Sequence, residues 1–196
     1  DIKPIVQPGS SDSASLDGVF EVLVRTHREL PEVKSLLIPE AWEKSKTLKQ
    51  AHRDFYEYAN GVMEPWDGPA AICAYGGRWA LAGMDRYVVT GDGLLVVGSE
   101  TGMVKIQETT VIEKGRLGPG QMIAVDLNEG RLCHDMELKD HVAGLSPFGE
   151  WVKSITKLSE LNGQGTGKCG DMSKAELRRR MITCGWSMED LELILQ

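Results

Sequence analysis

The hydrophobic pattern predicts three helices in the first third of the chain. One set of apolar residues recurs at intervals of three and four, as on one face of an amphipathic helix. The preceding run SSDSASLD offers Ser and Asp side chains that can accept hydrogen bonds from first-turn N–H groups. PEVKSLLIPEAW predicts a short element from Pro31 to Pro39, and a third helix is expected over residues 48–63. The set that defines the first helix is Leu16, Val19, Phe20, Leu23, Val24 and Leu30.

After Pro69 the pattern changes to short apolar runs separated by turn residues. AAICAYGGRWALAGMDRYVVTGDGLLVVGSE is interrupted at Gly77, Asp85 and TGDG, and VIEKGRLGPGQMIAVDLNEGRLCHD at residues 118–120 and 128–130. Gly118-Pro119-Gly120 and Asn128-Glu129-Gly130 are typical turn sequences. The two runs therefore predict antiparallel strands, and together with the helices they predict an α+β fold.

The last quarter of the chain has a different pattern. FGEWVKSITKLSEL predicts a short helix, NGQGTGKCGD a polar Gly-rich linker, and SKAELRRRMITCGWSMEDLELILQ two helical pieces broken near Gly185. Ser173 and Glu176 have the spacing of a capping box, which favours a helix start there. We place a domain boundary near residue 150.

Composition excludes several classes of protein. With 196 residues, 41% of them hydrophobic, the chain suffices for one sizeable domain. The net charge of −7, with RRR at 178–180 as the longest basic run, argues against nucleic acid as a partner. No apolar stretch reaches the roughly 20 residues of a membrane span, and the N-terminus lacks the features of a signal peptide. We therefore expect a cytoplasmic protein that does not enter a membrane.

The sequence patterns predict no metal site and no phosphate site. The four cysteines form no CxxC pair and the four histidines no HExxH motif, so structural thiols are expected rather than ligands. GQGTGKCG imitates a phosphate-binding loop, but Asn162 stands where the first glycine is required, and Cys169 follows the lysine. A hydroxyl for magnesium is thus missing, and a flexible linker is the better interpretation.

The stretch MEPWDGPAA, residues 63–71, offers two carboxylates around an indole. Glu64 and Asp67 could act as a general acid and base, as paired carboxyl groups do in glycosidases. The alternative, which we favour, is a rigid corner in which prolines fix the backbone and Trp66 packs into the core.

Seven stretches, in order, resemble the large subunit of bacterial glutamate synthase. They are SDSASLDGVFEVLVR, LIPEAW, VMEPWDGPAA, GRWALAGMDR, GSETGMVKI, VIEKGRLGPGQMIAVD and ELRRR. The resemblance covers essentially the whole chain. It implies that residues 1–150 are the C-terminal half of a class II glutamine amidotransferase domain, part of an N-terminal-nucleophile hydrolase α/β/β/α sandwich with antiparallel sheets. Residues 151–196 are then a helical connector into the central domain.

The resemblance assigns one substrate contact to this chain. The aspartate of the family's Ser-Asp-Ser motif holds the α-ammonium of glutamine, and that position is Asp12, with Ser11 and Ser13 as supporting residues. The residues alone leave a plain helix cap as the alternative. The family's catalytic N-terminal cysteine, glutamine-binding arginine and Asn-Gly oxyanion pair have no counterpart here, so we expect an internal segment that is inactive alone and supplies no catalytic residue.

The resemblance also implies the chemistry of a larger parent enzyme. That enzyme hydrolyses glutamine, channels the ammonia to 2-oxoglutarate, and forms glutamate reductively with FMN and an iron–sulfur cluster. No cofactor site is expected in this segment. Expected partners are glutamine, the rest of the large subunit, and an electron-donating small subunit or ferredoxin, the donor being left open. The alternative is a non-catalytic scaffold or interaction domain derived from the same fold.

The chain departs from the family in one place. About seven residues, including an Asn-Gly-Leu-Arg-Pro loop, are missing within GMDRYVV. We expect a tight connection around Asp85-Arg86, joining two strands as in a hairpin. We also expect the apolar strands to expose a large face when the preceding half of the domain is absent.

Overall fold

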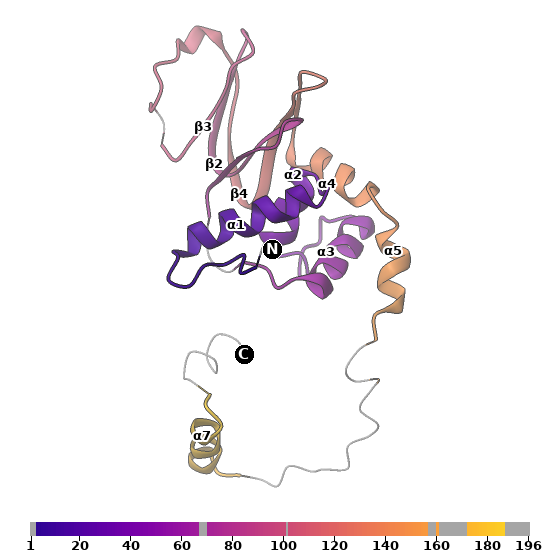
Figure 1. The fold of residues 1–196 in the computed structure, drawn as a ribbon. Coiled ribbons are helices and arrows are strands. Elements are labelled where there is room, and N and C mark those ends of the chain that lie inside the picture. Colours follow the sequence, from indigo (N-terminus) through magenta and orange to yellow (C-terminus); the bar gives the residue numbers. More distant parts are fainter. Residues whose placement is uncertain (1–2, 67–69, 101, 157–159, 161–171, 187–196) are drawn as a thin grey trace. The chain divides into compact units, whose positions relative to one another are not determined.

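The computed structural model describes residues 3–66, 70–100, 102–156, 160 and 172–186. The chain divides into two compact units, Asp1–Ile155 and Thr156–Gln196. The first contains helices and one antiparallel sheet (Figure 1), which confirms the α+β prediction. The assignment of residues 1–150 and 151–196 to two parts of a larger protein stays a prediction.

Three helices open the first unit, and they lie where the hydrophobic pattern placed them. They are α1 (Asp12–Arg25), α2 (Leu30–Leu37) and α3 (Gln50–Val62). The prediction was wrong for Leu30: α1 ends at Arg25, with Thr26 as its C-cap, and Leu30 is the first residue of α2. Pro31 lies in the first turn of α2. The N–H groups of a first turn have no partner within the helix, so a residue that lacks this group loses no hydrogen bond there.

The sheet is antiparallel throughout. Its strands are β1 (Ile72–Tyr75), β2 (Trp79–Thr90), β3 (Leu95–Gly98), β4 (Val111–Asp126) and β5 (Arg131–Cys133). β4 pairs along one edge of β2, and both β1 and β3 pair with the other edge. The predicted turns at Gly77, at TGDG and at residues 128–130 are confirmed as the connections between successive strands.

The predicted turn at residues 118–120 and the predicted hairpin at Asp85-Arg86 are both wrong. Gly118-Pro119-Gly120 lies inside β4, and β2 runs through residues 85–86 without a break. Between the pairs Gly83↔Met122 and Asp85↔Leu117, four residues of β4 stand opposite Met84 alone. The glycines bend β4 without ending it, because residues beyond the irregularity pair again with β2.

The core has a helical part and two sheet parts. One cluster, which includes Leu37, Phe55, Tyr56 and Phe148, lies among the helices. Successive side chains of a strand point to opposite faces of the sheet. Leu81 and Met122 belong to the cluster that includes Leu30 of α2. Their neighbours Ala82 and Ile123 belong to a separate cluster formed by strand residues. The helices therefore cover one face of the sheet.

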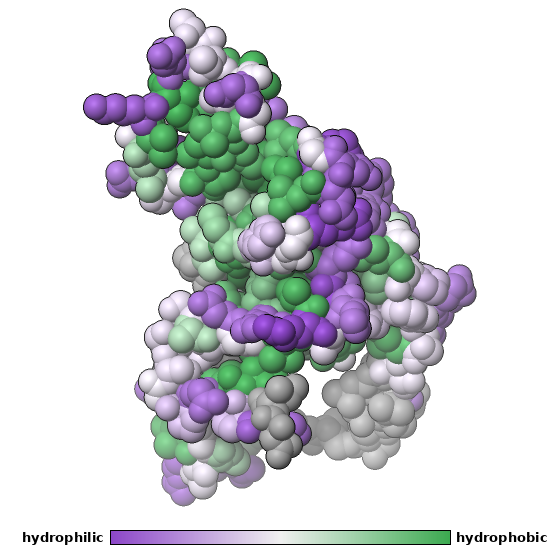
Figure 2. All heavy atoms as spheres, turned by 45° about the horizontal axis from the view of Figure 1, so that its top comes forward, coloured by the Kyte–Doolittle hydropathy of each residue, from purple (hydrophilic) through white to green (hydrophobic). Residues whose placement is uncertain are grey.

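The part of the sheet that reaches beyond the helices carries exposed apolar side chains. Ile112 of β4 is 70% exposed, and Met103, in the connection after β3, is 63% exposed. Figure 2 shows hydrophobic side chains gathered on this surface. The expectation of an apolar face without a cover is thus met in this region.

Three further helical segments complete the first unit, α4 (Asp135–Gly144), α5 (Phe148–Trp151) and η2 (Val152–Ser154), and a short η1 (Glu108–Thr110) precedes β4. The sequence pattern did not predict α4. In the second unit, α7 (Lys174–Thr183) begins at Ser173, whose Oγ accepts a hydrogen bond from Glu176 N at 3.2 Å. This confirms the predicted helix start. The Gly-rich stretch 162–171 and the last helical piece lie outside the described residues.

Candidate functional site

A groove with a volume of 1010 Å³ lies between α1 and β1. α1 supplies an apolar wall through Leu16, Phe20 and Val24, and residues 70–75 supply the opposite wall. Asp12, Asp17 and Glu21 also line the groove. Such a site can enclose an aliphatic chain while presenting carboxylates to a cation.

Asp12 is the first residue of α1 and is exposed at the end of this groove. Among the residues that the structure describes, the Asp12 carboxylate has no hydrogen-bond or ion-pair partner. The first turn of a helix carries unpaired N–H groups, and their partial positive charge makes it a favourable place for an acidic side chain. An exposed carboxylate without a partner is suited to a charge-assisted hydrogen bond from an ammonium group.

The helix cap is Ser11 and not Asp12. Ser11 Oγ accepts a hydrogen bond from Ala14 N at 3.3 Å, and it lies 3.2 Å from Ser13 Oγ. The alternative in which Asp12 is a plain cap is therefore wrong. Ser11 precedes the first turn of α1 and Ser13 lies within it, so both are next to Asp12 in the chain. Their role as residues that support ligand binding stays a prediction.

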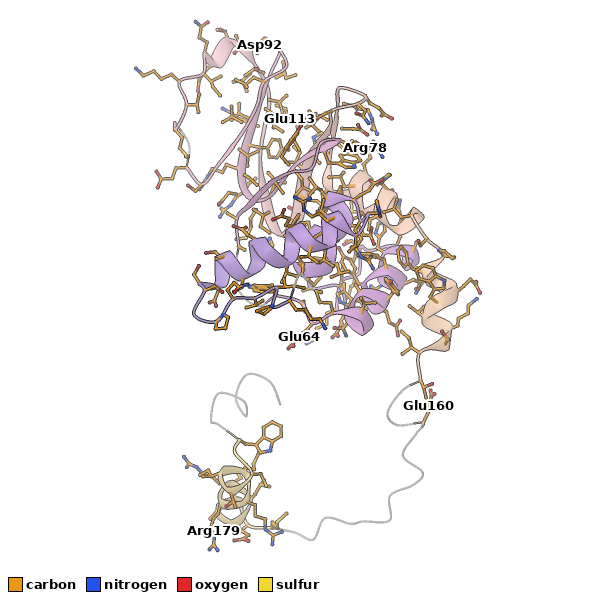
Figure 3. All side chains as sticks on the ribbon, in the orientation of Figure 1. Glu64, Arg78, Asp92, Glu113, Glu160 and Arg179 are labelled. Carbon is orange, nitrogen blue, oxygen red and sulfur yellow. The ribbon has the colours of Figure 1, made fainter. Side chains whose placement is uncertain are left out.

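The acidic pair of MEPWDGPAA is not assembled as a site in the described part of the chain. Glu64 is exposed and lies on the side of the helical layer away from the sheet (Figure 3), and Asp67 lies outside the described residues. Trp66 packs against the helical core and donates its backbone N–H to Leu37 O at 2.7 Å. The structure thus confirms Trp66 as a packing residue.

A buried group of charged side chains joins the helices to β4. Lys34 of α2 is 2% exposed and donates to the carbonyl of Gly120. Lys139 of α4 lies 2.6 Å from both Glu40 and Asp135. Asp135 also accepts the backbone N–H of Met122 at 3.0 Å. We call Lys34, Glu40, Asp135 and Lys139 the buried ion cluster.

Burial dominates the titration of two groups in this region. It lowers the pKa of Lys34 to about 8, against the partial compensation of Asp135 and Glu40. It also raises the pKa of the Tyr56 hydroxyl far above the usual range, with the nearby Glu40 and Asp135 acting in the same direction. Desolvation disfavours the charged form in both cases.

A second network closes the end of the sheet. Glu29 accepts hydrogen bonds from Trp79 Nε1 at 2.9 Å and from Arg78 at 3.1 Å, and lies 2.7 Å from His141 Nε2. Arg78, labelled in Figure 3, also donates to Asp126 at 2.8 Å and holds the pKa of that carboxyl below its usual value. This network joins the segment before α2 and the β1–β2 turn to the ends of β2 and β4 and to α4.

A third group of polar residues lies on β2, β4 and the start of α4. Glu113, labelled in Figure 3, accepts from the Tyr87 hydroxyl at 2.7 Å and lies 2.8 Å from His134 Nε2. These contacts hold the pKa of Glu113 below its usual value. Within the described ranges, three or more His, Cys, Asp or Glu side chains nowhere gather as a metal site would require.

The buried ion cluster was not predicted from the sequence, although the sequence contains one signal of it. Lys34 lies four residues after Leu30 and three before Leu37, on the helical face that should be apolar. Asp135 and Lys139 have the i,i+4 spacing of a helical ion pair, but α4 itself was not predicted. The partners Gly120 and Glu40 are distant in sequence, so no local pattern could have linked them.

Two comparisons with known sequences point to the same family. The family described as "Glutamine amidotransferases class-II" matches residues 1–151. The chain is 55% identical to the glutamate synthase [NADPH] large chain of Azospirillum brasilense, over all of this chain and 14% of that protein. It is 37% identical to ferredoxin-dependent glutamate synthase 2 of Synechocystis, over 99% of this chain and 13% of that protein. A chloroplastic ferredoxin-dependent glutamate synthase 2 of Arabidopsis thaliana is 38% identical over 12% of its length.

The chain thus spans about 14% or less of the length of these relatives. The alignment with the Azospirillum protein extends over 204 residues, whereas this chain has 196. Residues present in that relative are therefore missing from this chain. None of the helices in the described part of the chain is long and apolar enough to cross a membrane.

Proposed function

The chain belongs to the class II glutamine amidotransferases, and we propose that it forms the C-terminal half of the glutaminase domain of a glutamate synthase large chain. The observation that carries this proposal is the free Asp12 carboxylate at the end of the α1–β1 groove, in a chain related over its whole length to glutamate synthases.

In this proposal Asp12 binds the α-ammonium of glutamine. Ser11 fixes the first turn of α1 through its bond to Ala14 N, and Ser13 holds the Ser11 hydroxyl. The ammonium gains a charge-assisted hydrogen bond, and the apolar wall of α1 accommodates the aliphatic part of the substrate. The chain therefore binds and orients the substrate, whereas the nucleophile belongs to another part of the parent polypeptide.

The proposed reaction of the parent enzyme begins with glutamine and water and yields glutamate and ammonia. The ammonia is then added to 2-oxoglutarate, and a reduction gives a second glutamate. FMN and an iron–sulfur cluster supply the electron transfer for that second reaction when they are bound. Cys73 lies on β1 and Cys133 on β5, at the two ends of the strand order β1-β2-β4-β5. These two thiols therefore do not converge on one cluster. We assign FMN and the iron–sulfur cluster to other parts of the polypeptide.

The partners in the proposal follow from the same assignment. They are glutamine, the rest of the large chain, and either a small subunit that delivers electrons or ferredoxin. Among the relatives, the Azospirillum protein is named for NADPH and the Synechocystis protein for ferredoxin. The cytoplasmic location expected from the sequence stays a prediction.

Glutaminase measurements on two forms of the protein test the proposal. The complete polypeptide that contains this chain should convert glutamine to glutamate and ammonia in equal amounts, whereas residues 1–196 alone should release no ammonia. Sequencing both sides of the coding region should reveal an N-terminal cysteine upstream and an FMN-binding barrel downstream. A complete polypeptide that lacks both features and the activity would establish the alternative, a scaffold derived from this fold.

A further inference from the structure

The irregularity between β2 and β4 leaves backbone groups that the strand ladder does not pair. Four residues, 118–121, stand opposite Met84, and Met84 and Asp85 both have positive φ, 70° and 73°. Buried backbone groups that lose their ladder partners need others. Within this segment, the Gly120 carbonyl accepts a hydrogen bond from Lys34, and the adjacent Met122 N–H donates to Asp135. The buried ion cluster therefore supplies a partner for the Gly120 carbonyl, which lies in the unpaired segment.

The two lysines of the cluster have different partners. Lys139 lies 2.6 Å from each of two carboxylates. Among the described residues, the hydrogen bond of Lys34 Nζ goes to the neutral Gly120 carbonyl, and no carboxylate lies within ion-pair distance. Lys34 is thus a cation, 2% exposed, without its own counter-ion. Burial of such a group favours the neutral amine.

The elements around Lys34 contribute charges of both signs. α4 provides Asp135 and Lys139, and the segment after α2 provides Glu40. Tyr56 of α3 is uncharged, because burial raises the pKa of its hydroxyl. The two strands present backbone, since a Cβ added to Gly83 of β2 would lie 3.1 Å from Lys34 Cε, and Gly120 of β4 is the hydrogen-bond acceptor.

We propose that Lys34 and the irregular segment 118–121 form a pH-sensitive latch between the helical layer and the sheet, which closes more tightly when Lys34 loses its proton. The neutral amine still donates a hydrogen bond to the Gly120 carbonyl, and the cost of burying an unpaired cation disappears. α2 also carries Leu30, a wall residue of the α1–β1 groove. The latch therefore helps to fix the helical wall of that groove.

The direction of the effect follows from linkage. In the closed latch the pKa of Lys34 is about 8, whereas an opening that hydrates the amine returns it toward its ordinary value of 10.5. The open form therefore binds the proton more strongly. Below about pH 8 Lys34 is protonated in both forms, so its titration does not change the equilibrium constant for opening. Between about pH 8 and 10.5 that constant falls about tenfold for each pH unit.

Pulsed hydrogen–deuterium exchange on the complete polypeptide measures this equilibrium. The exchange rates of the peptide that covers residues 117–124 are corrected for the effect of pH on intrinsic amide exchange. A single isotope envelope that shifts gradually in mass shows that reclosing is faster than exchange, so that the rates report the opening equilibrium. In the wild type, protection should be flat from pH 7 to 8 and then rise by up to tenfold per unit toward pH 10. K34M has no amine and K34R keeps its charge, so both should give flat profiles.

K114M is the matched control, because Lys114 lies exposed on the same strand β4. It should keep the wild-type profile. A flat profile in the wild type, or a rise that persists in K34M, would overturn the proposal. If K34M does not fold, the wild type and K34R decide the question, since K34R retains the cation and must then lack the rise.

Discussion

Gly120 lies directly against the backbone of Glu40, so that a Cβ atom added to Gly120 would stand 2.3 Å from the Glu40 Cβ. This close approach lets the irregular part of β4 reach the buried ion cluster. Gly120 also has a positive φ of 76°. Both the space and the backbone conformation at this position require glycine.

The first prediction compares two glycines with positive φ. Gly120→Ala should lower the free energy of unfolding by about 2–5 kcal/mol, because left-handed strain of about 1–2 kcal/mol adds to overpacking of about 1–3 kcal/mol. Gly93→Ala should cost only the strain, since no atom lies within 4 Å of its added Cβ. Urea unfolding of both variants measures the difference, and equal losses would contradict this account of β4.

A second prediction concerns the carboxylate that joins α4 to β4. Asp135→Asn leaves Lys139 with a weaker partner in a buried site, and should lower the unfolding free energy by about 2–4 kcal/mol. Glu137→Gln is the control, because Glu137 is 46% exposed and pairs with Arg131 at the surface. It should change stability by less than about 1 kcal/mol. Thermal melting of both variants provides the comparison.

A third prediction concerns acid stability. Hydrogen bonds from Arg78 and from the N–H groups of Asn128 and Glu129 lower the pKa of Asp126 below its ordinary value of 3.8. The folded state therefore binds this proton less readily than the unfolded state. The resulting stabilisation is fully present above pH 3.8 and is lost as the pH falls through the lower, folded value.

Urea unfolding between pH 2 and 5 tests this assignment. Asp126→Asn should flatten the fall in stability over that range, because the titrating carboxyl is gone. Glu43→Gln, which changes an exposed carboxylate, should leave the wild-type profile in place. A profile that stays steep in Asp126→Asn would show that other carboxylates cause the acid transition.

The fourth prediction tests the proposed substrate contact in the complete polypeptide. Asp12→Asn should raise the glutamine KM by roughly 10-fold to 150-fold, equivalent to the loss of about 1.5–3 kcal/mol for a charge-assisted bond. Glu64→Gln is the control, because Glu64 is an exposed carboxylate that does not line this groove, and it should change KM little. An unchanged KM in Asp12→Asn would remove Asp12 from the substrate site.

Local sequence signals located most elements of the first unit. The three- and four-residue spacing located α1, the SSDSASLD run marked its start, and Pro31 marked the start of α2. Short apolar runs separated by turn residues located the strands, because both signals act over a few neighbouring residues. The resemblance then identified the family and selected Asp12, which the residues alone would have left as a possible cap.

Contacts between distant residues decided what the sequence could not. Gly118-Pro119-Gly120 has the local sequence of a turn. The residues of β4 before and after it pair with β2, and this pairing keeps the three residues inside one strand. From the sequence, Lys34 is a polar residue on an apolar helix face. Its hydrogen-bond partner Gly120 is 86 positions away, and only the tertiary structure brings the two residues together. Hydrophobic periodicity depends on neighbours along the chain, whereas strand register and the partners of buried charges depend on which segments meet in space.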